Sequence, residues 1–368
     1  MRIAFFVHSI ASDWNHGNAH FLRGLMSALA DRGHRITSWE RVGAWSAMHL
    51  VEDGGTAPIV RFAREFPEIR VRCYGGGPGL RERVAGAVGE ADLVIVHEWN
   101  DPDVVGLVGL EARRQGGIPV LFHDTHHRPV SAPHAIAALP LERYDGVLAF
   151  GESLRCVYRQ AFGIERTWTF HEAADVRRFR PLERSRDTDV LWIGNWGDEE
   201  RSDALRRFWL GAAGRLPELR FDAWGARYPD SALREVEEAG VRFNGWAPSL
   251  DVPELFARTR ATLHIPRRLY VERLPGIPTI RVFEALACGV PLVSTPWRDS
   301  EGLFRPGDYT VVETPDEMVE ALRRIVRDPA AAAEQAERGL ATIRDRHTCD
   351  HRAEQLMEIV DGLGRAGA

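Results

Sequence analysis

The sequence contains no lysine, and all 47 of its basic residues are arginine. Enzymes that form a Schiff base with a substrate or with pyridoxal phosphate need a lysine amine, and a Walker A loop needs a lysine to contact phosphate. The sequence therefore excludes these classes of protein. A phosphate group bound by this chain would have to meet arginine side chains or backbone N–H groups.

Cysteine is also scarce. The four cysteines lie far apart and form no Cys-x-x-Cys pair. This spacing favours neither a disulfide framework nor a zinc site. We expect reduced thiols in a cytoplasmic protein, because disulfides are rare in that compartment.

Long hydrophobic runs are absent as well. No apolar stretch approaches the ~18 residues that are needed to cross a membrane. The N-terminal apolar stretch turns polar after Val7, which is typical of a buried strand rather than of a signal peptide. We therefore expect no transmembrane segment, and peripheral contact with a membrane stays open.

Positive charge is not in excess. The formal net charge of −6 argues against a nucleic-acid partner, since such proteins usually carry a basic surplus. The chain does contain 44% apolar and 27% charged residues over 368 positions. This composition and length predict a folded protein with two domains.

Short apolar runs alternate with amphipathic helical stretches, the pattern of parallel α/β sheets. In the first half we expect strands at residues 3–7, 36–39, 93–96, 119–122, 147–150 and 168–170. The pattern then begins again, with strands expected at residues 190–193, 220–223, 241–243, 261–265, 291–294 and 309–312. In the second half, helices are expected at residues 199–213, 315–326 and 330–363.

The charged residues 181–187 show no apolar periodicity, and we expect them to link the two halves. Residues 1–181 and 182–345 would then form two Rossmann-like domains, and a helix over residues 346–368 would pack back toward the first. Two such domains facing each other would form a cleft at the carboxyl ends of their strands, where ligands bind in open α/β sheets.

The strongest functional signal is the stretch TIRVFEALACGVPLVST at residues 279–295. It predicts a helix that carries Glu284, ends at Gly289 and is followed by a strand. The stretch resembles the donor-site signature of GT-B glycosyltransferases related to the group 1 (family 4) enzymes, which reads roughly FEAMACGVPVV. Arg281, three residues before Glu284, is similar to an arginine of the spore-maturation (CgeB-like) branch. The resemblance covers nearly the whole chain and is specific for fold and reaction class rather than for substrate.

The resemblance implies an α/β protein of GT-B fold, with two facing Rossmann-like domains. Glu284 would accept hydrogen bonds from the ribose hydroxyls of a nucleotide. Arg201 matches, displaced by one position, the basic residue that neutralises the donor diphosphate. Backbone N–H groups at the start of the Glu284 helix would hold the same diphosphate; this turn contains Thr279, Ile280 and Val282.

Further donor-side residues follow from the same resemblance. Gly194 and Asn195 would form the turn beneath the diphosphate, and the family often has arginine where Asn195 stands. Arg281, Arg267 and Arg268 could supply the missing positive charge.

The sequence departs from the family at one position. The common pattern is Glu-x7-Glu, and Gly276 stands where the first glutamate is expected. That glutamate usually holds sugar hydroxyls, so the identity of the sugar and the stereochemistry of transfer both stay open. Glu272 is close in sequence and is a candidate replacement.

The acceptor side is less specific. His123 matches a histidine that lies near the transferred sugar in the family. An inverting enzyme would need a base there, whereas a retaining enzyme of this type needs none; the candidate bases are His123, Asp124, His126, His8 and Asp13. The polar loop over residues 8–20 also contains His16 and Gly17, and we expect it to face the acceptor.

These observations predict a bacterial, cytoplasmic glycosyltransferase that moves a sugar from a nucleotide-diphosphate sugar to a glycan, a lipid or a natural product. We expect no cofactor and no metal, because Arg201, Arg281 and helix N-termini would stabilise the charge on the departing diphosphate.

Several stretches of the sequence also have interpretations other than a metal-independent GT-B glycosyltransferase. Residues 97–98 and 123–127 have the residue types of a metal site but not its helical spacing. Residues 101–103 read Asp-Pro-Asp, like the metal motif of GT-A transferases, but fit a helix start better. The Gly-rich residues 73–79 read as a loop rather than as a phosphate site. A nucleotide-sugar 2-epimerase and a non-catalytic sugar- or nucleotide-binding module are the alternative functions.

Overall fold

The computed structural model describes residues 1–197 and 199–366. The chain forms two compact units. Unit 1 contains Met1–Glu172 and the C-terminal segment that begins at Cys349, and unit 2 contains Ala173–Thr348. Both units are parallel α/β structures.

Unit 1 is built on a seven-stranded sheet with the order β3-β2-β1-β4-β5-β6-β7, in which every neighbouring pair is parallel. The strands β4, β5 and β6 are buried along their whole length, as expected when helices cover both faces of a parallel sheet. The strands are β1 (Arg2–Val7), β2 (Arg35–Arg41), β3 (Ile69–Tyr74), β4 (Leu93–His97), β5 (Val120–Asp124), β6 (Gly146–Ala149) and β7 (Thr167–Thr169).

The strand β3 was not expected from the sequence. It alternates apolar and basic residues, reading IRVRCY, and it lies at the edge of the sheet. Its middle residues are partly exposed, so the strand lacks the continuous apolar run of its buried neighbours. The period of two was present in the sequence, but it was weaker than the signals of the central strands.

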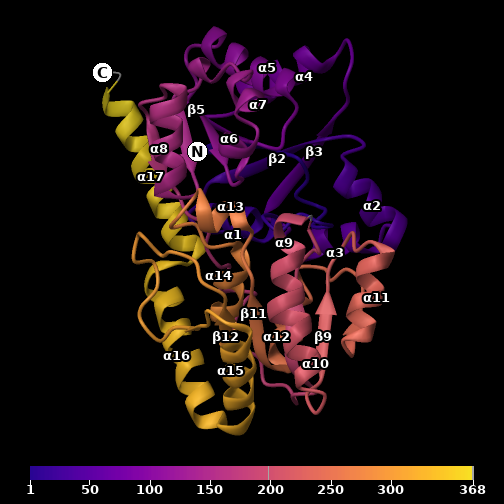
Figure 1. Ribbon diagram of the computed structural model, residues 1–368. Coiled ribbons are helices and arrows are strands. Elements are labelled where there is room, and N and C mark those ends of the chain that lie inside the picture. Colours follow the sequence, from indigo (N-terminus) through magenta and orange to yellow (C-terminus); the bar gives the residue numbers. More distant parts are fainter. Residues whose placement is uncertain (198, 367–368) are drawn as a thin grey trace. The chain divides into compact units, whose positions relative to one another are not determined.

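Helices connect the strands of unit 1 (Figure 1). They are α1 (Ala19–Asp31), α2 (Trp45–Gly54), α3 (Ala57–Glu65), α4 (Leu80–Gly89), α5 (Pro102–Arg114), α6 (Arg128–Ser131), α7 (Pro133–Ala137), the short 3-10 helix η1 (Leu141–Arg143) and α8 (Glu152–Phe162). The α5 helix has Asp101 as its N-cap residue and Pro102 at its first position, so the Asp-Pro-Asp stretch starts a helix.

The C-terminal helix α17 (Cys349–Ala366) belongs to unit 1. It packs against α1, and Arg32 at the end of α1 forms an ion pair of 2.7 Å with Asp350. On its other side, Gln355 Nε2 donates a hydrogen bond of 2.8 Å to the carbonyl of Thr169 in β7. These contacts join the end of the chain to the first sheet.

Unit 2 is built on a six-stranded parallel sheet with the order β10-β9-β8-β11-β12-β13. The strands are β8 (Thr188–Ile193), β9 (Phe221–Trp224), β10 (Val241–Phe243), β11 (Thr259–His264), β12 (Leu292–Ser294) and β13 (Thr310–Val311). The expected strands of the second half lie at these places, with ends that differ by a few residues.

The helices of unit 2 include one continuous helical stretch that the sequence predicted at residues 199–213. It consists of α9 (Glu199–Ala204), the π-helical turn η2 (Leu205–Leu210) and α10 (Gly211–Arg215). The others are α11 (Asp230–Glu238), α12 (Val252–Ala257), α13 (Arg268–Glu272), α14 (Ile280–Ala287), α15 (Pro315–Arg327) and α16 (Pro329–Arg346). Figure 1 shows α15 and α16 side by side, and the two helices pack on each other.

Residues 181–187, which were expected to link the two halves, lie inside unit 2. Arg184 forms an ion pair of 2.6 Å with Glu254 of α12, and the backbone N–H of Asp187 donates to the carbonyl of Arg258 at 3.0 Å. The segment is charged because it lies on the surface of the unit. Unit 2 already begins at Ala173, before the expected boundary at residue 181.

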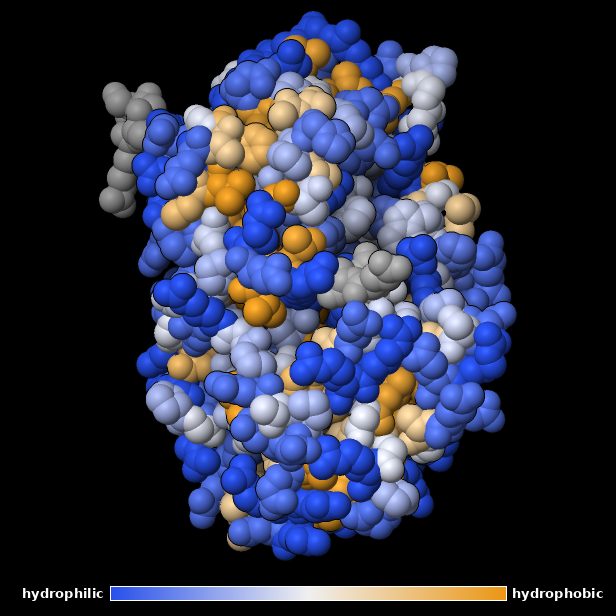
Figure 2. All heavy atoms as spheres, in the orientation of Figure 1, coloured by the Kyte–Doolittle hydropathy of each residue, from blue (hydrophilic) through white to orange (hydrophobic). Residues whose placement is uncertain are grey.

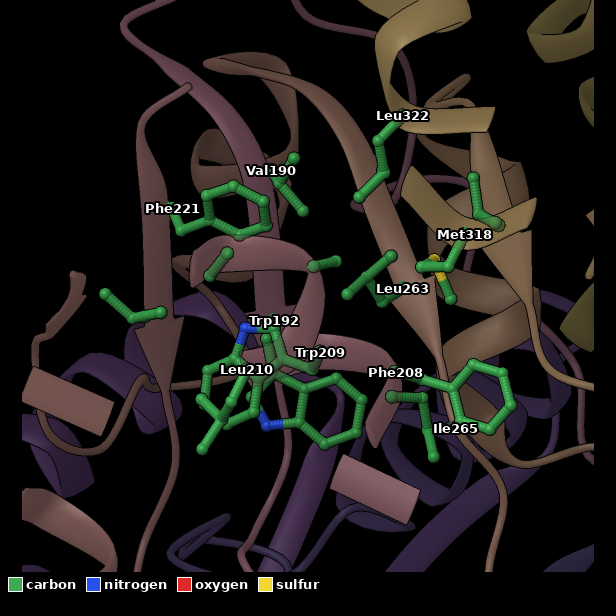
Figure 3. Close-up of a cluster of buried hydrophobic side chains, with 14 of the residues drawn as sticks. Val190, Trp192, Phe208, Trp209, Leu210, Phe221, Leu263, Ile265, Met318 and Leu322 are labelled. Carbon is green, nitrogen blue, oxygen red and sulfur yellow. The ribbon is translucent and has the colours of Figure 1, made fainter. Parts of the chain in front are cut away.

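One face of the unit 2 sheet carries a large hydrophobic core. Figure 3 shows Leu263 of β11 beside Met318 of α15, and Ile265, the residue after β11, beside Phe208 of η2. Trp192 of β8 and Trp209 of η2 lie in the same cluster, with ring centroids 5.6 Å apart. Because side chains alternate along a strand, residues 262 and 264 point to the opposite face.

The visible surface of the molecule is mostly hydrophilic, with hydrophobic residues scattered in small groups (Figure 2). Among the residues that the structure describes, no helix is both long and apolar enough to cross a membrane.

We predict that Leu322→Ala lowers the free energy of unfolding by about 2–5 kcal/mol, because it leaves a cavity in the core of unit 2. Leu322 is fully buried on α15. Urea unfolding followed by tryptophan fluorescence measures the change. Arg324→Ala, at an exposed position of the same helix, serves as the control and should shift the free energy by less than about 0.5 kcal/mol. Equal effects of the two substitutions would contradict the described core.

Candidate functional site

Unit 2 has its topological switch point between β8 and β11. From β8 the chain runs outward through β9 and β10, and it then returns to place β11 on the other side of β8. The connections after β8 and β11 therefore diverge at the carboxyl ends of these strands, where open α/β sheets bind ligands. We call this place, with the turn after β8 and the helices α9, α13 and α14, the unit 2 edge.

Arg201 lies at the unit 2 edge. Its Nη2 donates a hydrogen bond of 3.0 Å to the carbonyl of Ile265, just after β11. Its guanidinium also lies over the ring of Trp192 in β8, 5.0 Å from the ring centroid. These two contacts hold a positive charge across the switch point, where an anionic ligand would meet it.

The turn after β8 is packed tightly. The N–H of Gly194 donates to the carbonyl of Trp224 at 2.9 Å, and the side-chain oxygen of Asn195 accepts from the N–H of Ala226 at 3.2 Å. A Cβ atom on Gly225 would lie 2.1 Å from the carbonyl oxygen of Gly194, so only glycine fits there. Asn195 thus holds the backbone of the turn. The predicted stretch from Gly194 to Arg201 also includes Asp198, which lies outside the described residues.

Glu284 is buried on α14, with its side chain 2% exposed. It forms an ion pair with Arg281, whose side chain is 20% exposed. The sequence suggested that Arg281 supplies charge to a diphosphate, and the structure brings it onto the carboxylate instead. The two residues lie one turn apart on α14, and this helix packs against β11 and β12.

The first turn of α14 presents backbone rather than side chains. Thr279 is the N-cap residue in an extended conformation, and its carbonyl accepts from the N–H of Val282 at 3.0 Å. The side chains of Ile280 and Val282 are buried in the unit. Ile280 and Val282 could therefore contribute to ligand binding only through backbone groups, and the N–H of Val282 is already donated to Thr279.

The remaining donor-side candidates lie at α13. Arg267 is the N-cap residue of this short helix, and Arg268 and Glu272 approach each other at 4.0 Å, each with a side chain 61% exposed. An exposed pair of this kind contributes little to stability. Glu272 therefore lies on the surface of unit 2.

Gly276 explains why the first glutamate of the Glu-x7-Glu pattern is missing. Its φ angle is +87°, and a Cβ atom there would lie 2.7 Å from both Ser300 Oγ and Glu301 Oε1. A residue with a side chain would be strained at this φ angle, and the ends of the Ser300 and Glu301 side chains would have to move. The carboxylate that approaches this position comes from Glu301, which sequence reasoning missed because it lies beyond the matched motif.

His264 is a second residue that sequence reasoning missed. It is the last residue of β11 and is 2% exposed. The only signal was a histidine inside an otherwise apolar run, ATLHIP. A histidine in such a run is more often a satisfied core residue than a site residue, so the pattern alone could not identify it.

Unit 1 has its own switch point, between β1 and β4, and a group of histidines lies there. His8 follows β1, His97 ends β4 and His123 lies in β5. Their rings form a series with His16 from the loop after β1: centroids are 6.2 Å apart for His8–His16, 6.2 Å for His16–His97 and 5.4 Å for His97–His123. We call this group the unit 1 edge.

Burial keeps these histidines neutral. It lowers the pKa of His8 to about 4 and that of His123 to about 3. The pKa of His16 also falls to about 3, through burial first and then through the nearby His8 and Arg23. His123 is 1% exposed, and neither of its ring nitrogens has a hydrogen-bond partner among the described residues. A neutral imidazole can donate from one nitrogen and accept at the other.

The loop after β1 is held by two buried charged residues. Glu40 accepts a hydrogen bond of 2.8 Å from the N–H of Ile10, and Arg23 donates one of 2.8 Å to the carbonyl of the same residue. Arg23 also forms an ion pair of 3.0 Å with Asp13. Asp13 therefore helps to anchor the loop, whereas Gly17 is exposed on it.

Asp124 is completely buried and positions its neighbours. It accepts hydrogen bonds from Tyr158 Oη at 2.5 Å and from the N–H of His126 at 2.8 Å. Burial raises the pKa of Asp124 to about 7, against these two hydrogen bonds, which lower it. His126 is half-buried, with its ring 5.0 Å from that of Trp99.

Two residues of the alternative metal site, His97 and Glu98, contact other side chains. His97 Nε2 lies 2.9 Å from Thr125 Oγ1, and Glu98 forms an ion pair with Arg128. Within residues 1–197 and 199–366, no group of three or more His, Cys, Asp or Glu side chains is arranged to hold a metal ion.

Comparison with known proteins identifies a related domain and a shared fold. Residues 201–358, which include Arg201, His264 and Glu284, match a family model described as "Glycosyl transferase-like". The sequence matches no curated protein sequence. Residues 201–358 lie almost entirely in unit 2 and include most of the unit 2 edge.

Solved structures of glycosyltransferases share the fold of the whole chain. HepE of Anabaena, solved with UDP-glucose, is 16% identical with a TM-score of 0.70, over 98% of this chain and 100% of that one. Sucrose-phosphate synthase of Thermosynechococcus elongatus is 16% identical with a TM-score of 0.66, over 100% of both chains. A glycosyltransferase of Rickettsia africae is 11% identical with a TM-score of 0.66, over 98% of both. The chain thus has the GT-B fold, as predicted, and the domain match and the fold together support a glycosyltransferase.

We predict a pH-dependent difference in stability between the wild type and Asp124→Asn. Below about pH 4 the carboxyl group is protonated in both the folded and the unfolded chain. Between an ordinary pKa of 3.8 and a folded pKa of about 7, only the unfolded chain loses the proton, so the wild type loses stability as the pH rises. Asparagine has no such titration.

The measurement is chemical unfolding of both proteins from pH 4 to pH 8. The free energy of unfolding of the variant, relative to that of the wild type, should rise up to about pH 7 and then level off. A difference that stays constant over this range would show that Asp124 does not titrate as described.

Proposed function

We propose that the protein is a metal-independent glycosyltransferase that binds a nucleoside diphosphate sugar at the unit 2 edge and transfers the sugar to an acceptor. The proposal is supported by the contact of Arg201 across β8 and β11 and by the position of Glu284 on α14, the helix that packs on β11 and β12, both within the matched residues 201–358. One residue supplies positive charge and the other supplies hydrogen-bond acceptors, which are the needs of a diphosphate and of a ribose.

We further propose that the donor is a uridine diphosphate sugar. HepE of Anabaena has been solved with UDP and with UDP-glucose, and a TarM mutant of S. aureus has been solved with UDP. These complexes support a uridine nucleotide for a chain of the same fold. The relation to the family 4 enzymes and to the spore-maturation (CgeB-like) branch is part of this proposal, and so is a bacterial cytoplasmic location.

The chemistry assigned to the unit 2 edge is stabilisation of a leaving group. The bond between the anomeric carbon and the diphosphate breaks, positive charge develops on the sugar ring, and negative charge builds on the departing diphosphate. Arg201 and the N–H groups at the start of α14 would stabilise this negative charge. Arginine can supply the charge that a metal ion supplies in other transferases, which is the basis for proposing independence from metal.

The roles that we propose for Arg281 and Glu272 differ from those that the sequence suggested. Arg281 contacts Glu284, so we assign it the orientation of that carboxylate together with a contribution to the positive potential. Arg267 stays a candidate for direct contact with the diphosphate, because it begins α13 at the same edge. Glu301 replaces Glu272 as the candidate for contacts with the sugar, since its carboxylate reaches the position of Gly276.

We assign the acceptor to the unit 1 edge. His123 is neutral and buried, and within the described part of the chain neither of its ring nitrogens has a partner, so it is suited to hydrogen bonds with hydroxyl groups. His8, His16 and His126 are the other candidates for contact with the acceptor. Asp13 and Asp124 are assigned to hold these elements, because the first pairs with Arg23 and the second with Tyr158 and the backbone of His126. The acceptor is a glycan, a lipid or a natural product.

We predict that Arg201→Ala and Glu284→Ala each lower the rate of sugar transfer from UDP-glucose at least ~100-fold, the usual effect of losing one charge-stabilising group. The readout is radiolabelled sugar transfer, or hydrolysis of the donor if no acceptor is known. Two exposed residues of unit 2 serve as matched controls: Arg207→Ala and Glu320→Ala should leave the rate within about twofold.

Of three possible results, two would contradict the proposal and one would show that the variants do not test it. Near-wild-type activity in both Arg201→Ala and Glu284→Ala would remove the proposed donor site. Loss of activity in the controls as well would point to a general loss of structure. Release of a free epimer from the donor, without transfer, would favour the alternative of a nucleotide-sugar 2-epimerase.

A further inference from the structure

A buried histidine at the unit 2 edge has a ring nitrogen that nothing in the described chain satisfies. His264 ends β11, and its neighbours Leu263 and Ile265 point into the hydrophobic core (Figure 3). Side chains alternate along a strand, so His264 projects from the opposite face of the sheet. Its Nε2 atom is buried and has no hydrogen-bond partner among the described residues.

The hydrogen bonds of the neighbouring strand determine the tautomer of His264. Ser294 in β12 donates its hydroxyl hydrogen to the carbonyl of Thr295 at 2.8 Å. A serine hydroxyl has one hydrogen, so at His264 Nδ1, 2.9 Å away, Ser294 Oγ must accept. The proton of the neutral imidazole is therefore on Nδ1, and Nε2 carries only a lone pair.

The surroundings keep this lone pair unprotonated. Burial, and after it the nearby guanidinium of Arg201, lower the pKa of His264 to about 3. At neutral pH, Nε2 is consequently a hydrogen-bond acceptor and cannot donate. A ligand atom that meets it must bring a hydrogen, which excludes phosphate oxygens and favours hydroxyl groups.

His264 lies near residues that are proposed to bind the donor. The helix α14, which carries Glu284, packs against β11 and β12. Arg201 reaches the carbonyl of Ile265, the residue that follows His264. The unsatisfied nitrogen thus lies within the same group of residues as the two proposed donor contacts, and it is buried, which is unusual for a polar atom without a partner.

We propose that His264 is a specificity-determining residue whose Nε2 accepts a hydrogen bond from a hydroxyl group of the nucleotide sugar. The inference rests on the proposed function, because it needs a donor at the unit 2 edge. The hydroxyl belongs either to the ribose or to the transferred sugar. Both present the same chemistry, and a comparison of two ligands separates them.

The experiment measures the dissociation constants of UDP and UDP-glucose by calorimetry, for the wild type and for His264→Phe. Phenylalanine keeps the ring and removes the acceptor, so the hydroxyl would lose its partner, which weakens binding by about tenfold. A loss for both ligands assigns the contact to the ribose. A loss for UDP-glucose alone assigns it to the sugar. Unchanged affinity for both ligands overturns the inference.

Thr342→Val is the matched control. Thr342 lies on α16 of the same unit, is fully buried and has an Oγ1 atom without a partner among the described residues. The substitution removes a buried polar atom that, like His264 Nε2, has no partner among the described residues. Because this atom lies outside the unit 2 edge, both affinities should stay unchanged. An equal loss in Thr342→Val would show that the effect of His264→Phe is structural, and it would overturn the inference.

A second measurement does not depend on the folding of a variant. The ¹⁵N resonance of His264 Nε2 in the wild type should have the position of an unprotonated nitrogen and should move when UDP-glucose is added. A protonated Nε2, or no movement at saturating ligand, overturns the inference even if the donor binds. If the wild type binds neither UDP nor UDP-glucose, the proposed donor itself fails, which is a different outcome.

Discussion

The unit 2 edge depends on the pairing of β8 with β11. These strands are far apart in the sequence, yet they are neighbours in the sheet, and this pairing brings Arg201 to the carbonyl of Ile265. The guanidinium is further held over Trp192 in β8. A chain that paired its strands in sequence order would not place these groups together, and no switch point would form at this edge.

Buried charge is treated differently in the two units. In unit 2, Arg281 forms an ion pair with Glu284, and the guanidinium of Arg201 lies close enough to His264 to lower the pKa of that ring. In unit 1 burial leaves a series of neutral histidines, while Glu40 and Arg23 hold the loop around them. Positive charge suits a diphosphate and neutral imidazoles suit hydroxyl groups, which is the basis for proposing that the two edges bind different substrates of a transfer reaction.

Two candidate residues changed role once their partners were known. Asp124 was a candidate base, but it is completely buried and accepts hydrogen bonds from Tyr158 and from the backbone of His126. Asp13 was another, and it pairs with Arg23. A carboxylate that holds a loop in place would act on the reaction indirectly, by positioning the residues next to it. These assignments stay proposals, as does the cleft that the sequence suggested between the two domains.

The sequence alone determined the class of the fold, most of the strands and the helix of Glu284, because these depend on local periodicity and on the Gly-Val-Pro stop after that helix. The edge strand β3 and the boundary at Ala173 were decided by tertiary contacts, which leave little local trace, whereas the packing of the C-terminal helix with unit 1 was expected from the sequence. The same holds for Gly276, whose φ angle of +87° disfavours a side chain next to Ser300 and Glu301, and for His264, whose tautomer depends on Ser294. Hydrogen bonds between distant segments decide such features, and the order of residues along the chain does not reveal which segments will meet.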